Sequence, residues 1–257
     1  MLYIHKRRTP DVVKKQAEEI MNMPDSGYLS IRLPENTRQL RSLFEKMPKE
    51  EIRKSLYVEQ HGLCAYCMGK IEPQYDSMKI EHYKALSENK AGALDYRNYL
   101  GVCYGGEKNG KGKPHVLCCD AARNERELTV DPWNKRQMEA IGYKRNGEIF
   151  VRTDKGLDCR LTAVMQKDLD EILVLNGKKD AEGRVVSDTA TKLIANRRST
   201  YQSVCTQFDR WDRKKCLTKD FLKEKIDDLE KQLQGDGIAE PYIGVRLYFY
   251  KRKYKRM

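Results

Sequence analysis

The chain has 257 residues, of which 50 are Lys or Arg and 38 are Asp or Glu, so its formal net charge is +12 at pH 7. Its longest purely aliphatic run is residues 172–175, far shorter than the roughly 20 apolar residues of a membrane-spanning helix, which excludes a helical membrane protein. The hydrophobic share of 39% is too high for a wholly disordered chain.

The first 59 residues are expected to form a helical segment. Thr9 followed by Pro10 predicts a helix cap with proline at the first helical position, and the helix should run to about Met21. A turn-rich connector over 24–34 leads to a second helix over 37–46, and a third helix opens at Pro48 and stops at Gly62.

Residues 63–131 differ in character, since they hold five of the eight Cys and two of the four His. The pattern predicts a strand over 78–83, a short helix or turn over 96–102, a short helix over 119–127 and a strand over 128–132. Residues 105–113 form a basic, Gly-rich insert. A phosphate-contacting loop and a solvated loop are equally good interpretations of this insert.

The remaining residues, 136–257, are expected to be mainly helical. A hairpin over 143–151 should turn at Asn146 and Gly147. Apolar spacing predicts three helices, and a strand is expected near the end of the chain; these are helices over 161–175, 189–214 and 218–234 and a strand over 242–250. Residues 251–256 are a basic run, for which contact with a phosphate backbone and a frayed terminus both stay open.

The strongest chemical signal is the pair Cys64 and Cys67. Two intervening residues let both thiolates reach one tetrahedral ion at ~2.3 Å. A closed structural site needs two more ligands, which Cys103 and either Cys118 or Cys119 can supply. Residues 1–8 carry no secretory signal, so we expect a cytoplasmic chain whose clustered thiols bind metal and form no disulfides. We interpret three other cysteines as ordinary thiols, namely Cys159, Cys205 and Cys216.

Between the two cysteine groups lie Glu81, His82 and, further on, Asn98. A carboxylate can hold a hard divalent cation, while a neutral imidazole can take a proton from water. An asparagine amide can fix the orientation of that imidazole. Strand alternation would point Glu81 and His82 to opposite faces, unless a twist or bulge brings both to one site.

Taken together, these residues resemble the zinc-stapled HNH nucleases with a ββα-metal core. Two segments, residues 61–67 and 119–124, are similar to the corresponding segments of the retron- and Septu-associated group, the PtuB-like proteins. Residues 172–176 and 196–197 look like the helical tail of that group. The resemblance covers residues 60–132 and rests on the motifs Cys64-x-x-Cys67, Ile80-Glu81-His82, Tyr96-Arg97-Asn98-Tyr99-Leu100, Cys103 and Cys119-Asp120.

The resemblance implies a role for each matching residue. His82 would be the general base, and Asn98 would orient it or support the neighbouring loop. Glu81 and Asp120 would hold Mg²⁺ or Mn²⁺, with Asp120 at a position where related proteins have His or Asn. Arg123 replaces a common Lys and would contact a phosphate. The implied structural zinc ligands are Cys64, Cys67, Cys103 and Cys119.

We therefore expect an α+β fold, with a zinc-stapled HNH core over 60–135 between the helical segments 1–59 and 136–257. The resemblance implies an endonuclease that favours DNA and is the effector of an antiphage complex. Its partners would be nucleic acid, a PtuA-like SMC/ABC-type ATPase, and a retron reverse transcriptase with its RNA–DNA product. Alternative functions are a nuclease that cleaves RNA such as tRNA, a non-catalytic zinc-dependent nucleic-acid-binding subunit, and a pure assembly subunit.

Overall fold

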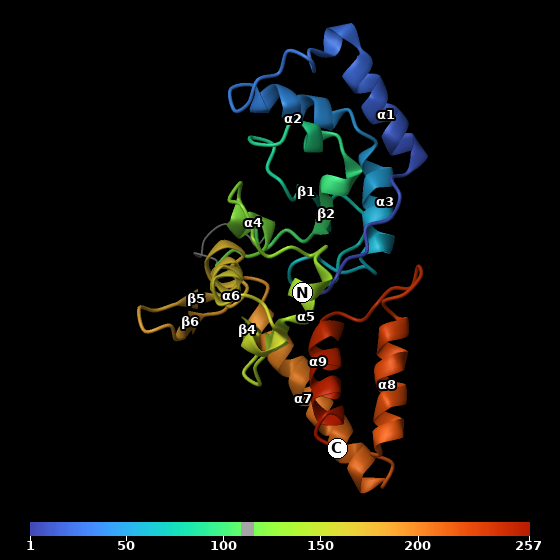
Figure 1. Cartoon of the computed structure of the whole chain (residues 1–257), viewed down its shortest axis with the longest axis vertical. Coiled ribbons are helices and arrows are strands. Elements are labelled where there is room, and N and C mark those ends of the chain that lie inside the picture. Colours follow the sequence, from blue (N-terminus) through green and yellow to red (C-terminus); the bar gives the residue numbers. More distant parts are fainter. Residues whose placement is uncertain (109–115) are drawn as a thin grey trace.

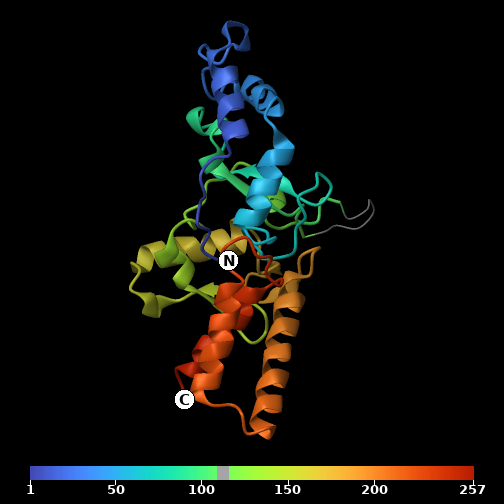
Figure 2. The same ribbon diagram turned by 90° about the vertical axis from the view of Figure 1, so that its right-hand side faces the viewer.

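A computed structural model describes residues 1–108 and 116–257. Most of the basic insert over 105–113 therefore lies outside the described residues. The fold is mixed α+β, as expected, and within the described ranges its strands form three two-stranded antiparallel sheets. Figure 1 shows an elongated molecule with α1 and α2 at one end, α8 and α9 at the other, and β1 and β2 between them, and Figure 2 gives the same arrangement from the side.

The elements follow one another along the chain with these bounds. The α-helices are α1 (Asp11–Asn22), α2 (Thr37–Glu45), α3 (Lys49–Glu59), α4 (Asp120–Arg123), α5 (Lys135–Glu139), α6 (Cys159–Lys167), α7 (Leu193–Arg213), α8 (Lys219–Lys231) and α9 (Ile243–Tyr254). The strands are β1 (Lys79–His82), β2 (Tyr99–Val102), β3 (Ile141–Tyr143), β4 (Ile149–Val151), β5 (Lys178–Lys179) and β6 (Val185–Ser187). Short 3-10 turns are η1 (Pro24–Ser26), η2 (Ala91–Ala93), η3 (Tyr96–Asn98) and η4 (Thr153–Lys155), and a π-helix, η5, spans Asp168–Ile172.

The helices α1, α2 and α3 confirm the expected N-terminal helical segment. Ile52 and Leu56 of α3 are fully buried, and α3 contacts both β1 and β2. The Gln60 side chain, just after α3, donates to the carbonyl of Gly101 at 2.7 Å and accepts from its N–H at 2.7 Å. This pair of bonds fixes β2 against the end of α3.

The central sheet pairs β1 with β2 in antiparallel register, with Glu81 opposite Leu100 and His82 opposite Tyr99. The expected strand over 78–83 is confirmed by β1. The prediction of a short helix or turn over 96–102 is right for η3 only, because residues 99–102 form β2. Every residue of β2 is buried, and an apolar run of this kind suits a strand covered on both faces.

The expected strand over 128–132 is absent from the structure, which describes all of these residues. The Asp168 carboxylate accepts from the N–H groups of Thr129 (2.6 Å) and Val130 (2.8 Å). The Tyr83 hydroxyl lies 3.3 Å from the carbonyls of Leu128 and Val130 and donates to them. Side chains thus satisfy the backbone groups that a neighbouring strand would otherwise pair with.

The hairpin prediction is confirmed by β3 and β4, which turn at Gly147 with φ +94°. The helix expected over 161–175 is shorter: α6 passes into the π-helix η5 at Asp168. The helices expected over 189–214 and 218–234 are confirmed by α7 and α8.

The expected C-terminal strand over 242–250 is wrong, because these residues begin helix α9. Phe249 packs against Tyr201 of α7 with ring centroids 4.5 Å apart, and Tyr250 packs against Trp211 at 5.7 Å. A helix buried around most of its circumference carries apolar residues at both strand and helix spacing, so alternation alone misleads. The basic run 251–256 starts inside the last turn of α9, where cations suit the helix dipole.

The start of α9 is bonded to the loop that carries the first two cysteines. The N–H of Ala239 donates to the carbonyl of His61 at 3.0 Å, and the N–H of Tyr242 donates to the carbonyl of Met68 at 3.0 Å. A methyl group on Gly244 would stand 2.7 Å from the Met68 sulfur, so α9 approaches this loop very closely. Within the described residues, every helix is too short or too polar to cross a bilayer.

Candidate metal centre and the adjoining cleft

Four cysteine sulfurs gather at the centre of the molecule. The ligand atoms of Cys64, Cys67, Cys103 and Cys119 all lie within 4.8 Å of one another. The closest approaches are 4.0 Å between Cys64 and Cys119 and 3.8 Å between Cys67 and Cys103. Four sulfurs about 2.3 Å from one tetrahedral ion would be about 3.8 Å apart. The group can therefore hold a structural metal such as zinc.

The loop that presents Cys64 and Cys67 has the geometry of a metal knuckle. The N–H of Cys64 donates to the carbonyl of Gly69 at 2.9 Å, and the N–H of Met68 donates back to Cys64 at 3.0 Å. The N–H of Gly69 points at the Cys67 sulfur, 3.3 Å away. These bonds hold both thiolates on the inner side of a tight turn and reduce the negative charge on one of them.

The structure decides between the two adjacent candidates for the fourth ligand. Cys119 faces the other three sulfurs and has an unusual backbone, with φ 58° and ψ −138°. Cys118 points elsewhere, with its sulfur 3.3 Å from the hydroxyl of Thr191. The sequence left both possible because neither residue type nor spacing reports the direction of a side chain.

Beside the metal centre lies a cleft with a volume of about 300 Å³. Glu81 and His82 of β1 and Asp120 of α4 all line it. The predicted carboxylate and imidazole therefore reach one site, although neighbours on a strand ordinarily face apart. Arg41, Lys79 and Glu107 also line the cleft. A cation would find four carboxylates here, those of Glu81, Glu107, Asp120 and Glu125.

His82 is held in one orientation by its surroundings. Its Nε2 lies 3.0 Å from the carbonyl oxygen of Ala93. A carbonyl only accepts hydrogen bonds, so Nε2 carries the proton and Nδ1 keeps its lone pair. The ring packs edge-on against Phe44 at 4.5 Å and Tyr99 at 4.9 Å. Burial lowers the pKa of His82 to about 4, so the imidazole is neutral at pH 7.

Asn98 supports the loop that follows His82 and makes no bond to the imidazole. Its amide oxygen accepts from the N–H of Lys84 at 2.8 Å, and its amide nitrogen donates to the carbonyls of Lys84 (3.0 Å) and Gly92 (3.1 Å). The carbonyl next to Gly92 is that of Ala93, which holds His82. Of the two roles that the resemblance implies for Asn98, the geometry favours loop support.

Arg123 is buried, with 1% of its area exposed, and it is not among the residues that line the cleft. It forms an ion pair with Glu81 and donates to the carbonyls of Tyr83 (2.6 Å) and Arg126 (2.8 Å). These contacts leave the guanidinium inaccessible to a phosphate, in contrast to the expectation from sequence. The Arg123 guanidinium instead holds the Glu81 carboxylate in place. The same carboxylate also accepts a hydrogen bond from the Tyr66 hydroxyl at 3.3 Å.

The two predicted cation ligands, Glu81 and Asp120, perturb one another. Burial raises the pKa of Glu81 well above its ordinary value; the neighbouring Asp120 raises it further, and Arg123 opposes both effects. Lys79 pairs with Asp120 and lies 3.2 Å from Glu107. Oxygen donors converging from β1 and α4 suit a hard divalent ion such as Mg²⁺ or Mn²⁺.

Lys79 and Tyr66 are contributors that the sequence analysis missed. Lys79 lies two positions before Glu81 on the same strand, and residues at that spacing share a face, so its approach to the cleft was readable from the pattern. Tyr66 lies between the first two cysteines, and nothing in its spacing points toward Glu81.

Comparison with known proteins gives no family for the chain. No family model matches it, and a search of curated proteins finds no significant match.

Proposed function

We propose that this chain is a metal-dependent endonuclease of the HNH type, which hydrolyses phosphodiester bonds of nucleic acid, with DNA as the favoured substrate. One observation carries the proposal: a single cleft is lined by His82, whose Nε2 is bonded to Ala93, and by the two acidic residues Glu81 and Asp120. The order β1, β2 and α4 beside four clustered sulfurs supports a ββα-metal centre with a structural zinc.

In this proposal the chain's own residues activate water and place the phosphate. A Mg²⁺ or Mn²⁺ ion on Glu81 and Asp120 would supply the charge that stabilises the phosphorane-like transition state and the leaving oxygen. His82 accepts the proton of the attacking water at Nδ1, and its Nε2–H bond to Ala93 stabilises the positive charge that develops on the ring. Asn98 is a positioning residue, because it anchors the loop that carries Ala93.

The acidic cleft favours catalysis over simple binding. A protein that only binds phosphates has no use for two carboxylates in contact, since they repel the ligand. Glu81 and Asp120 beside a neutral imidazole therefore support hydrolysis over a non-catalytic zinc-dependent subunit. The proposed antiphage role, with a PtuA-like ATPase partner, rests on the resemblance over residues 60–132 alone. The alternative that the chain cleaves RNA such as tRNA, in place of DNA, rests on the same resemblance.

The test compares the wild type, His82→Ala and His5→Ala on plasmid, single-stranded DNA and total RNA, with and without added Mg²⁺ or Mn²⁺. His5 is an exposed histidine outside the cleft and serves as the matched control. We expect His82→Ala to lose about 10²–10⁴ in cleavage rate, with unchanged zinc content and melting temperature, while His5→Ala behaves as the wild type. Equal cleavage by His82→Ala and the wild type would overturn the proposal.

A further inference from the structure

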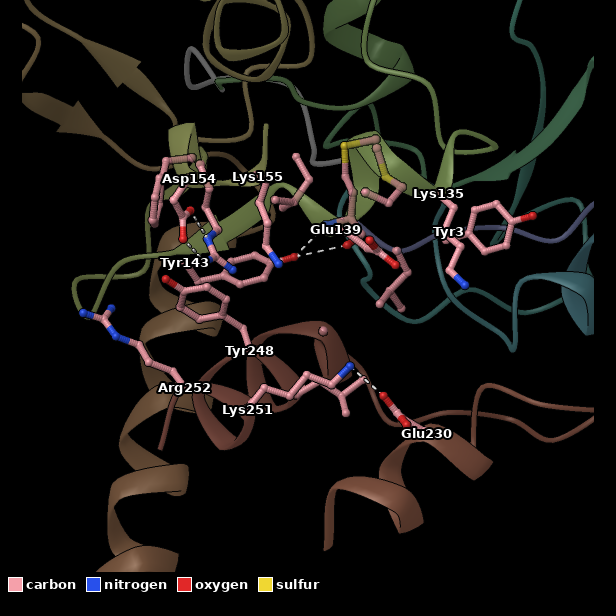
Figure 3. Close-up of a pocket in the computed structure, with 18 of the residues that line it drawn as sticks. Tyr3, Lys135, Glu139, Tyr143, Asp154, Lys155, Glu230, Tyr248, Lys251 and Arg252 are labelled. Carbon is pink, nitrogen blue, oxygen red and sulfur yellow. Dashed lines mark hydrogen bonds and ion pairs between the residues drawn. The ribbon is translucent and has the colours of Figure 1, made fainter. Parts of the chain in front are cut away.

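A second and larger groove lies in the half of the molecule that carries α8 and α9, away from α1. It has a volume of about 1050 Å³ and is walled by α5, the β3–β4 hairpin, α8 and α9. Figure 3 shows Lys251 and Arg252 extending from α9 on one side and Lys135 and Lys155 on the other. We call it the α9 groove. None of the residues proposed for hydrolysis lines it.

The α9 groove carries a clear excess of positive charge. Seven cationic and three acidic side chains line it. Arg152 pairs with Asp154 at 2.6 Å and Lys251 pairs with Glu230 at 2.6 Å, which neutralises two of the three acids. Five cations form no ion pair with any residue that the structure describes: Lys135, Lys155, Arg252, Lys255 and Arg256.

Aromatic rings lie among these cations. Tyr3 is 42% exposed, and Phe150 and Tyr248 are half-buried in the groove wall. The Tyr248 ring is held edge-on by Tyr143 at 5.8 Å and Phe150 at 6.4 Å, so its position is fixed before any ligand arrives. Unpaired cations next to accessible rings are the two components of sites that bind single-stranded nucleic acid.

We propose that the α9 groove binds single-stranded nucleic acid, with phosphates on the cations of α9 and α5 and an unpaired base stacked on Tyr3. The choice of nucleic acid over another polyanion rests on the proposed function. An acidic protein segment would satisfy the cations but would leave the tyrosine rings without a matching face. A duplex keeps its bases stacked inside, away from Tyr3 and Tyr248. In this proposal the basic run 251–256 binds phosphates, because four of its residues line the α9 groove.

The experiment measures binding of a fluorescent 12-nucleotide oligothymidylate by anisotropy, without divalent ions and with full-length His82→Ala as the parent, so that no cleavage intervenes. Arg252→Glu with Lys255→Glu reverses two charges in the groove. Lys14→Glu with Lys15→Glu makes the same change of net charge on exposed α1, at the far end of the molecule (Figure 1).

We expect the groove variant to bind weakly and the α1 variant to bind as the parent does. Loss of two phosphate contacts should reduce the slope of log K against log salt by about 1.4, at roughly 0.7 per contact on a single strand. Tyr3→Ala should weaken binding by about 5-fold to 150-fold, and Tyr3→Phe, which keeps the ring, should restore it.

Three results would overturn the proposal. They are equal effects of the groove and α1 variants, binding of a duplex of the same length as tightly as the single strand, and binding of a poly-glutamate peptide as tightly as the oligonucleotide. Because the parent already lacks His82 and the assay reads binding alone, failure here is distinct from failure of the cleavage test.

Discussion

Replacing the two adjacent cysteines one at a time tests the metal centre most directly. Cys119→Ser removes one of four sulfurs that lie within 4.8 Å of one another. Cys118→Ser makes the same chemical change one residue away, where the sulfur lies beside the Thr191 hydroxyl and the Gly105 carbonyl. We expect the first variant to lose tightly bound zinc and the second to keep one zinc per chain.

The size of the effect follows from the number of ligands. Structural zinc sites contribute about 10–16 kcal/mol at pH 7, which is about 2.5–4 kcal/mol for each of four thiolates. In a domain of 150–250 residues, each kcal/mol lowers the melting temperature by about 2–4 °C. Cys119→Ser should therefore melt at least about 5–16 °C below the wild type, because complete loss of the ion also removes the share of the other three ligands. Cys118→Ser gives up one weak hydrogen bond, worth about 1 kcal/mol or less.

The assay is zinc content after gel filtration in a mild chelator, followed by thermal denaturation of the same samples. Zinc retained by Cys119→Ser, or lost by Cys118→Ser, would refute the assignment of the fourth ligand. Equal losses in both variants would show that the doublet acts through packing and does not act through coordination.

Two further predictions concern the support of the centre. A side chain on Gly105, at φ +58°, would place its Cβ 1.9 Å from the Cys118 carbonyl oxygen, whereas Gly235, at φ +62°, has open space. Gly105→Ala should thus lower zinc affinity in a chelator competition while Gly235→Ala leaves it unchanged; equal affinities would contradict this reasoning. Arg123→Met leaves Glu81 buried without its partner and should destabilise the fold by about 3–5 kcal/mol in urea denaturation. Adding Glu81→Met should recover much of that loss, and strictly additive losses would show that the pair is not coupled.

The sequence predicted the chemical composition of the candidate site better than its geometry. The four sulfurs and the cleft-lining trio of Glu81, His82 and Asp120 come together as the motifs indicated. The burial of Arg123 was unpredictable, because it depends on acceptors at Tyr83 and Arg126 that only the folded chain brings near. Charge and residue type alone do not reveal whether a cation reaches solvent.

In the fold, too, structure set by local residues was predicted correctly, whereas structure set by distant contacts was not. Asn146 and Gly147 predicted a turn that forms as expected, because the conformation of this turn depends on those two residues themselves. Segment 128–132 has strand-like composition, yet Asp168 takes its N–H groups from 38 or more positions away. Helix α9 has alternating apolar residues that read as a strand, and its contacts with α7 and α8 decide otherwise.

The backbone hydrogen bonds that Ala239 and Tyr242 donate connect the start of α9 directly to the loop that carries Cys64 and Cys67. The cleft proposed for hydrolysis lies on one side of the metal centre, and helix α9 lies on the other. Trimming the chain to 60–135 would retain all four clustered cysteine sulfurs. It would also expose Met68 and remove two backbone hydrogen bonds from the loop that presents Cys64 and Cys67. A fragment cut at the motif boundaries would therefore lack contacts that hold the cysteine loop in the whole chain.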